Sequence, residues 1–202
     1  MLYYERKAKQ KGYKLIVGID EVGRGSLAGP VMSTAVLLKK TRFKNRIDDS
    51  KKLTPKLRER SCKEILENSY TTVGIVSEVI IDKINIHQAT RLSMEIALEN
   101  LIKCLVKNKI NLKNLYVLVD GNVYLKTSHK FQNIIKGDQK SLSIASASIV
   151  AKVMRDRLMC VYDKIYPYYG FGKHKGYGTK EHFCAIKKFG LLPIHRRTFN
   201  HA

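Results

Sequence analysis

The stretch that decides the fold is Leu15-Ile16-Val17-Gly18-Ile19-Asp20-Glu21-Val22-Gly23-Arg24-Gly25, an apolar run followed by two acids and a Gly-Arg-Gly turn. The apolar part predicts a strand from Lys14 to Ile19. Successive strand side chains point to opposite faces, so we expect Asp20 and Glu21 to converge only if the strand ends or bulges there. The glycines would let backbone N–H groups approach an anion closely. The segment therefore offers metal ligands beside an anion cradle, although a solvated acidic strand end and a simple turn remain an alternative.

Outward from this stretch, the pattern predicts a mixed sheet with helices on its faces, an α/β fold. Val31 to Leu38 is expected to be a strand with Pro30 at its entrance, and it would pair antiparallel with the first strand across the glycine turn. Thr54-Pro55 would open a helix, as an N-cap followed by a first-turn proline. The other expected strands are Thr71–Val79, Leu115–Val119 and Phe131–Ile135, and the other expected helices are Ile84–Val106 and Ser141–Tyr166. Small residues at 144–148 would allow the last helix to pack closely on the sheet.

Acids stand beside glycine at the ends of three expected strands: Asp20-Glu21, Asp120 and Asp138. Because sites in open α/β sheets form outside the carboxyl ends of the strands, we expect these acids to share one pocket. An Asp-Gly turn without function is the alternative for Asp120. Four oxygen ligands without His or Cys suit Mg²⁺ or Mn²⁺ and not zinc. Two such ions flanking a phosphate favour phosphodiester hydrolysis.

The charge of the chain indicates a polyphosphate partner. Lys and Arg number 38 against 17 Asp and Glu, which gives a formal net charge of +21 over 202 residues. Nucleic acid is the first candidate, and a basic scaffold protein without chemistry is the alternative. The glycine turn lacks the G-x-x-x-x-G-K-[ST] order of a nucleotide-binding P-loop. The length suits one domain over residues 1–202.

Targeting signals and cysteines point to the cytoplasm. Residues 1–12 form a basic leader without the apolar core of a secretory signal, and no apolar run reaches membrane-spanning length. The four cysteines have no C-x-x-C pair, so we expect buried, reduced thiols. They are Cys62, Cys104, Cys160 and Cys184.

Several ordered blocks between about Lys14 and Phe199 together resemble the ribonuclease HII family. The resemblance covers nearly the whole chain, and a chance match to all the blocks in order is very improbable. The blocks are residues 18–25, Asp49-Ser50-Lys51-Lys52-Leu53, Val119-Asp120-Gly121-Asn122, Lys136-Gly137-Asp138, residues 147–152, Tyr169-Gly170-Phe171, residues 174–179 and His195-Arg196-Arg197-Thr198-Phe199.

The resemblance implies a ribonuclease H-like fold with a short helical C-terminal segment, residues 167–202, that contacts substrate. It implies a metal-dependent endonuclease that cleaves RNA in RNA–DNA hybrids and nicks duplex DNA 5′ of single ribonucleotides, leaving 3′-hydroxyl and 5′-phosphate ends. Two ions, Mg²⁺ or Mn²⁺, would be held by the catalytic carboxylates Asp20, Glu21, Asp120 and Asp138. Gly23, Arg24 and Gly25 match the turn that reads the ribonucleotide backbone, Tyr177 matches its partner tyrosine, and Lys51 is expected to contact a phosphate.

Other readings remain open at this level. A non-catalytic nucleic-acid-binding protein of the same fold is the main alternative, and a DNA nuclease or strand transferase is a third. We expect a monomer, and the residues do not say whether a replication clamp recruits it. Lys152 and Arg155 could bind phosphate or pair with Asp138 or Asp156.

Among the aromatic and histidine residues, His174 and His182 are expected to be surface or substrate-adjacent groups and not a zinc pair. Tyr166, Tyr168 and Tyr169 are expected to pack in a core or hinge.

Overall fold

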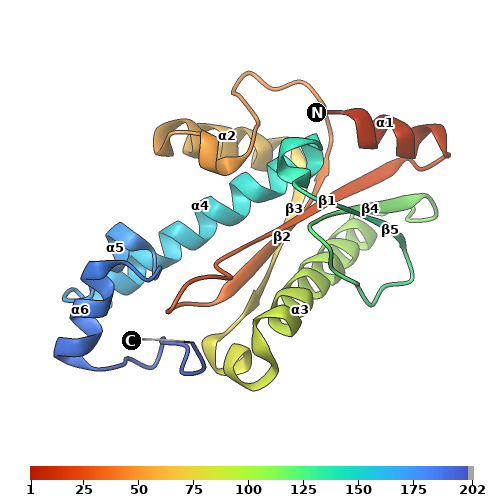
Figure 1. The fold of residues 1–202 in the computed structure, drawn as a ribbon. Helices are drawn as coiled ribbons and strands as arrows, with labels where there is room; N and C mark the ends of the chain where they lie inside the picture. The colour runs from red at the N-terminus through yellow and green to blue at the C-terminus, as the bar shows by residue number, and fades with distance from the viewer. Residues whose placement is uncertain (200–202) are drawn as a thin grey trace.

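A five-stranded mixed sheet forms the centre of the molecule in the computed structural model, which describes residues 1–199 (Figure 1). The strand order is β3-β2-β1-β4-β5. β1 pairs antiparallel with β2 and parallel with β4. Of the outer strands, β3 pairs antiparallel with β2, and β5 pairs parallel with β4. The strands are β1 Leu15–Val22, β2 Val31–Leu38, β3 Ser69–Val76, β4 Leu115–Asp120 and β5 Lys130–Ile134. The predicted mixed sheet and the antiparallel pair of β1 with β2 are confirmed.

The end of β1 differs from the prediction. The strand does not stop or bulge at Asp20 but continues to Val22, with Asp20 opposite Thr34 and Glu21 opposite Ser33 in regular register. The strand that ends here is its other neighbour, β4, whose last residue is Asp120. Pairing with β2 therefore keeps β1 extended, while the loss of β4 opens one edge beside the two acids.

Helices cover both faces of the sheet. α3 (Glu78–Lys107) packs on one face, and α4 (Leu142–Ile165) packs on the other with α2 (Pro55–Glu67) against it (Figure 1). Thr54 caps α2 by accepting a hydrogen bond from the Leu57 N–H at 3.3 Å, as predicted. The third strand ends at Val76, not Val79, because α3 already begins at Glu78.

The close packing of α4 depends on Gly18. A Cβ added to Gly18 would collide with the backbone of Ser143 and Ile144 at the start of α4. The small residues predicted to permit this approach are fully or nearly fully buried. The apolar side chains of the opposite face form a separate core with α3, centred on Val17, Ile19, Leu98 and Leu101. The sheet is thus held between two cores, which fixes the position of the strand ends.

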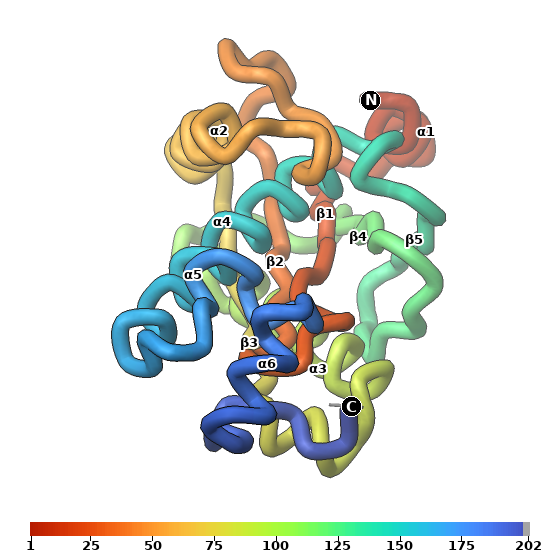
Figure 2. The backbone as a smooth tube through the Cα atoms, turned by 60° about the vertical axis from the view of Figure 1, so that its left-hand side comes forward, coloured from red at the N-terminus to blue at the C-terminus, as the bar shows by residue number. Residues whose placement is uncertain are grey.

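Short helices lie at both ends of the chain. The basic leader forms α1 (Tyr3–Gln10), whose buried Glu5 accepts hydrogen bonds from the Ser141 hydroxyl at 2.6 Å and the Ser143 N–H at 2.9 Å. After α4 come α5 (Phe171–His174) and α6 (Lys180–Phe189), the expected short helical segment. Figure 2 shows the chain after α6 returning to the turn between β1 and β2. Positions 200–202 of the predicted segment lie outside the described residues.

The cysteines correct one expectation. All four are free thiols, but only Cys62 is buried, and its burial raises the pKa of that thiol to about 11. Cys160 and Cys184 are exposed because they lie on the outer faces of α4 and α6. Among the described residues, no helix is long and apolar enough to span a membrane.

Candidate active site

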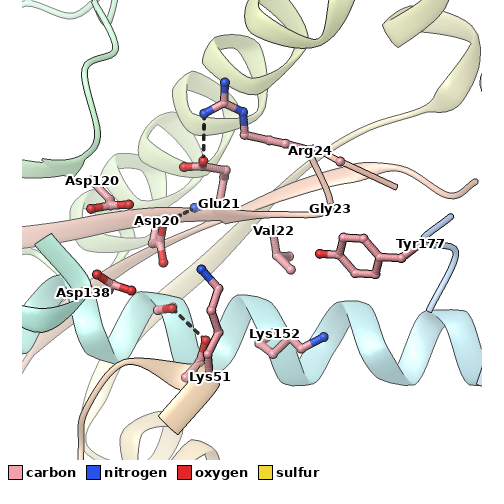
Figure 3. Close-up of a pocket in the computed structure, with 13 residues that line it drawn as sticks. Asp20, Glu21, Val22, Gly23, Arg24, Lys51, Asp120, Asp138, Lys152 and Tyr177 are labelled. Carbon is pink, nitrogen blue, oxygen red and sulfur yellow. Dashed lines mark hydrogen bonds and ion pairs between the residues drawn. The ribbon is translucent and has the colours of Figure 1, made fainter. Parts of the chain in front are cut away.

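The carboxylates of Asp20, Glu21 and Asp120 meet where β4 ends beside β1. One oxygen from each lies within 4.8 Å of the others. The parallel register, with Ile19 beside Val119, brings Asp20 level with Asp120. Glu21 points to the α3 side of the sheet and Asp20 to the α4 side (Figure 3). The two acids converge despite the strand alternation because the edge left open by β4 gives both faces access to the same space.

Hydrogen bonds from the backbone orient two of these carboxylates. Asp20 accepts from the N–H of Glu21 at 2.7 Å, and Asp120 accepts from the N–H of Gly137 at 2.6 Å. Gly137 begins a single 3₁₀ turn, Gly137–Gln139, that also carries the buried Asp138 into the same pocket. The structure therefore brings all four predicted acids together, with Asp138 at the margin of the closer group of three.

The electrostatics of this cluster favour a bound cation. Burial, together with the charges of Glu21 and Asp120, raises the pKa of Asp20 well above its usual value. Burial also raises the pKa of Glu21, although Arg24 opposes the shift. Burial and the charges of Asp120 and Asp49 raise the pKa of Asp138. Neighbouring carboxylates with raised pKa values are costly to ionise, and a bound cation would neutralise their charge. Because their ligand atoms are all oxygens, a hard divalent cation fits them.

The Gly-Arg-Gly turn borders the acids. Gly23 has φ 89°, in the left-handed region, and a Cβ there would collide with the side chain of Arg155. Around Gly25 no atom lies within 4 Å of an added Cβ, so this side of the turn is open. The Arg24 side chain points away, toward α3, where it contacts Glu21 Oε1 at 3.3 Å and His87 Nδ1 at 3.3 Å. The open backbone of the turn is therefore available to a ligand.

Lys51 reaches the pocket from the loop before α2. Asp49 caps its short 3₁₀ turn by accepting from the Lys51 N–H at 2.9 Å. Ser50 in that turn lies 3.0 Å from Ser148 of α4, oxygen to oxygen, which fixes the loop against the helix. In Figure 3 the Lys51 ammonium points toward Asp20 and Asp138. Neighbouring Lys52 instead pairs with Asp48 at 3.6 Å.

Tyr177 forms the far wall of the pocket. This residue is 37% exposed, and its hydroxyl points toward Val22 (Figure 3). A β-bridge joins Tyr177 to Ser26, just after the glycine turn. The cavity bounded by the acids, the turn, Lys51 and Tyr177 has a volume of about 480 Å³. Every residue predicted for the site from the sequence lines this one cavity.

Comparison with known proteins agrees with this geometry. The family model described as ribonuclease HII matches residues 17–202. The chain belongs to the ribonuclease HII family. A ribonuclease HII from Borrelia recurrentis is 52% identical over 187 residues, which are 92% of this chain and 98% of the relative. This member of the family is accordingly an endoribonuclease that hydrolyses RNA in RNA–DNA hybrids.

Solved structures of related enzymes share the fold of this chain. The ribonuclease H2 of Pyrococcus horikoshii OT3 superposes with a TM-score of 0.73 at 25% identity, covering 94% of this chain and 95% of that one. Bst-RNase HIII, solved in complex with Mn²⁺, gives a TM-score of 0.71 at 16% identity over 96% of this chain and 70% of that one. The predicted ribonuclease H-like fold is confirmed.

Two buried arginines have structural roles that the sequence does not indicate. Arg155 donates to the carbonyls of Pro30, Lys175 and Ala28 at 3.1, 2.9 and 3.0 Å, so neither phosphate binding nor an acidic partner describes it. Arg196 donates to the carbonyls of the glycine turn, and burial beside Arg155 lowers its pKa to about 10. Lys152 pairs with Asp156 at 2.8 Å and also lines the cavity. An arginine within a basic sequence carries no local signal of burial.

The histidines and tyrosines of the C-terminal segment correct other predictions. His182 is fully buried, stacked on His174 at 4.4 Å between ring centroids, and so is not a surface group. Tyr169 is buried and donates to the Gly190 carbonyl at 2.7 Å, as a core residue would. Tyr168, however, is 76% exposed. Packing among α5, α6 and the chain after α6 decides which of these rings is covered.

Proposed function

We propose that this endoribonuclease nicks duplex DNA on the 5′ side of a single embedded ribonucleotide, in addition to cleaving RNA–DNA hybrids. The observation that carries the proposal is one cavity that joins an acidic cluster, the open backbone of a glycine turn and Tyr177. The acids suit the reacting phosphate, while the turn and the tyrosine suit recognition of one sugar. A single such position is sufficient for a substrate that contains a single ribose.

Asp20, Glu21, Asp120 and Asp138 would hold the cations, and Mg²⁺ or Mn²⁺ fits their oxygen ligands. A neighbour of the same fold was solved with Mn²⁺, which supports this ion class. Two bound cations would supply an activated water and stabilise the leaving oxygen. The backbone N–H groups that hold Asp20 and Asp120 keep these carboxylates from rotating away when a phosphate arrives.

Recognition of ribose would depend on the turn. A 2′-hydroxyl both donates and accepts hydrogen bonds, so backbone groups of Gly23, Arg24 and Gly25 could distinguish it from the hydrogen of deoxyribose. Tyr177 would lie against the same sugar from the opposite wall. Lys51, which points into the cavity beside Asp138, would contact a phosphate near the cleavage position.

The deciding experiment compares a DNA duplex that carries one ribonucleotide with the same duplex made of DNA alone, each with and without Mg²⁺ or Mn²⁺. We expect a nick only in the first duplex and only with metal. Cleavage of the all-DNA duplex would favour a general DNA nuclease instead. The ends provide a second readout: 3′-hydroxyl and 5′-phosphate are expected, whereas a 2′,3′-cyclic phosphate would contradict attack by water.

We also propose that the enzyme acts as a monomer in the cytoplasm. The acids, the turn and Tyr177 all come from one chain, so the cavity needs no second copy. Sedimentation of the active enzyme at the concentrations of the assay tests the monomer, and fractionation of cells tests the compartment.

A further inference from the structure

The buried Arg196 binds the backbone carbonyls of the glycine turn. Its Nη1 donates to the Arg24 carbonyl at 2.8 Å, its Nη2 donates to the Gly23 carbonyl at 2.6 Å, and both Nη2 and Nε donate to the Gly29 carbonyl. In a planar trans peptide, the N–H points opposite to the C=O. Fixing the carbonyls of Gly23 and Arg24 on the buried side therefore aims the N–H groups of Arg24 and Gly25 at the cavity.

His195, the preceding residue, holds Tyr177 through a directed chain of hydrogen bonds. The Leu192 N–H donates to His195 Nδ1 at 2.8 Å, so the proton of a neutral His195 lies on Nε2. His182 Nδ1 lies 3.0 Å from the Tyr177 carbonyl, which can only accept, so Nδ1 carries the proton of His182. The two Nε2 atoms, 3.0 Å apart, then match as donor and acceptor. The chain runs from Leu192 through both rings to the backbone of Tyr177.

One short backbone ladder joins these two arrangements. The Arg196 N–H donates to the Leu27 carbonyl at 2.9 Å, and the Gly29 N–H donates to the Ile194 carbonyl at 2.9 Å. Leu27 also bonds to the segment that carries Tyr177, because its N–H donates to the carbonyl of Gly176 at 2.8 Å. Figure 2 shows the returning C-terminal chain lying against this turn. The turn and Tyr177 are therefore attached to the same two adjacent residues.

We propose that His195 and Arg196 are positioning residues that set the distance between the glycine turn and Tyr177, and so determine how well the enzyme acts on a single ribonucleotide. The inference rests on the proposed function of those two elements. A long hybrid carries further 2′-hydroxyls on both sides of the cut phosphate that can hold the strand in place, so it depends less on the contact with the turn. A duplex with one ribose offers a single register and loses activity when the turn moves.

The test is Arg196→Lys, which keeps the charge but leaves one ammonium to replace a fork that spans three carbonyls. We expect cleavage at a single ribonucleotide to fall by about tenfold to a hundredfold, as a displacement of about 1 Å costs in other sites, and cleavage of a long hybrid to fall much less. The matched control is Arg60→Lys at an exposed position of α2, which should change neither rate.

A second variant tests the other connection. His182→Asn keeps an amide N–H for the Tyr177 carbonyl but cannot reach His195, and we expect the same selective loss. If Arg196→Lys does not fold, as judged by its thermal unfolding, this variant decides. Free guanidinium, added below concentrations that unfold the protein, should raise the cleavage rate of Arg196→Ala at a single ribonucleotide relative to its rate on a long hybrid. The two rates of Arg60→Ala should not change.

The outcomes separate this inference from the proposed function. A wild-type enzyme that ignores a single ribonucleotide would contradict the proposed function before any variant is made. A wild-type enzyme that nicks there, together with folded variants that lose activity equally on both substrates or on neither, would contradict the positioning role of His195 and Arg196 alone.

Discussion

Asp20 shows how one residue serves function at the expense of stability. Its pKa is raised in the folded protein by burial and by the neighbouring acids, so the folded state binds the proton more tightly than the unfolded state. The contribution to stability is therefore present below about pH 4 and is lost as the pH rises through the folded pKa. Ionisation of Asp20 in the metal-free protein therefore costs stability.

Asp20→Asn should raise the unfolding free energy of the metal-free protein at pH 7 by on the order of 1 kcal/mol, with the gain shrinking toward pH 4. Activity should fall more than about 100-fold, because loss of a metal ligand costs more than loss of a residue that only hydrogen-bonds to a ligand. Chemical denaturation in EDTA and cleavage assays at saturating Mg²⁺ measure the two effects. Asp48→Asn is the control. The hydrogen bond from Arg46 lowers the pKa of Asp48, so removing the Asp48 charge should not stabilise the protein. Near-normal activity of Asp20→Asn would remove Asp20 from the metal site.

Tyr177→Ala should lower cleavage at a single ribonucleotide by about tenfold or more and affect a long hybrid much less, because only the first substrate depends on one recognition event. Metal binding, measured by calorimetry, should be unchanged, since Tyr177 is not among the acids. Tyr177→Phe separates the hydroxyl from the ring. Equal losses on both substrates would make Tyr177 a general structural residue.

At the scale of elements, Glu64 of α2 anchors the loop that leads to Lys51. It is buried, which alone would raise its pKa, but it accepts hydrogen bonds from the N–H groups of Asn45 and Lys44 at 2.9 Å, and these bonds lower the pKa to about 2. The usual pKa of a glutamate, which the unfolded chain is expected to have, is 4.5. The folded state therefore favours the ionised form, and its stabilisation is present above pH 4.5 and is lost as the pH falls toward 2.

Glu64→Gln should accordingly lower the unfolding free energy at pH 7 by about 2 kcal/mol, the range of hydrogen bonds to a charged group, and the difference should vanish near pH 2. Glu67→Gln, an exposed position of the same helix, is the matched control. Urea denaturation across this pH range measures both variants. A pH-independent difference would show that packing, and not the charge of Glu64, holds the loop.

At the scale of the whole molecule, the net charge of +21 sets how binding responds to salt. Each phosphate that a cation neutralises releases counterions, so affinity for a duplex should fall steeply as salt rises. Lys51→Ala should flatten the log–log slope by about one unit if Lys51 contacts a phosphate. Lys113→Ala, at the opposite end of β4, should leave the slope unchanged. Fluorescence anisotropy in Ca²⁺, without cleavage, gives the slopes, and an unchanged slope for Lys51→Ala would place Lys51 in solvent.

The sequence by itself determined the elements and the chemistry of this protein. The apolar runs of β1 and β4, the Thr54 cap and the acids beside glycine are local signals, because the periodicity and turn chemistry behind them involve neighbouring residues only. Tertiary structure alone decided how the acids meet: β1 continues past Asp20, and it is the end of β4 that opens the space. It also decided that Arg155, Arg196 and His182 are buried. Their partners are carbonyls and rings far away in the chain. Such contacts form only when distant segments pack together, so the residues next to each of them in the sequence do not indicate its burial.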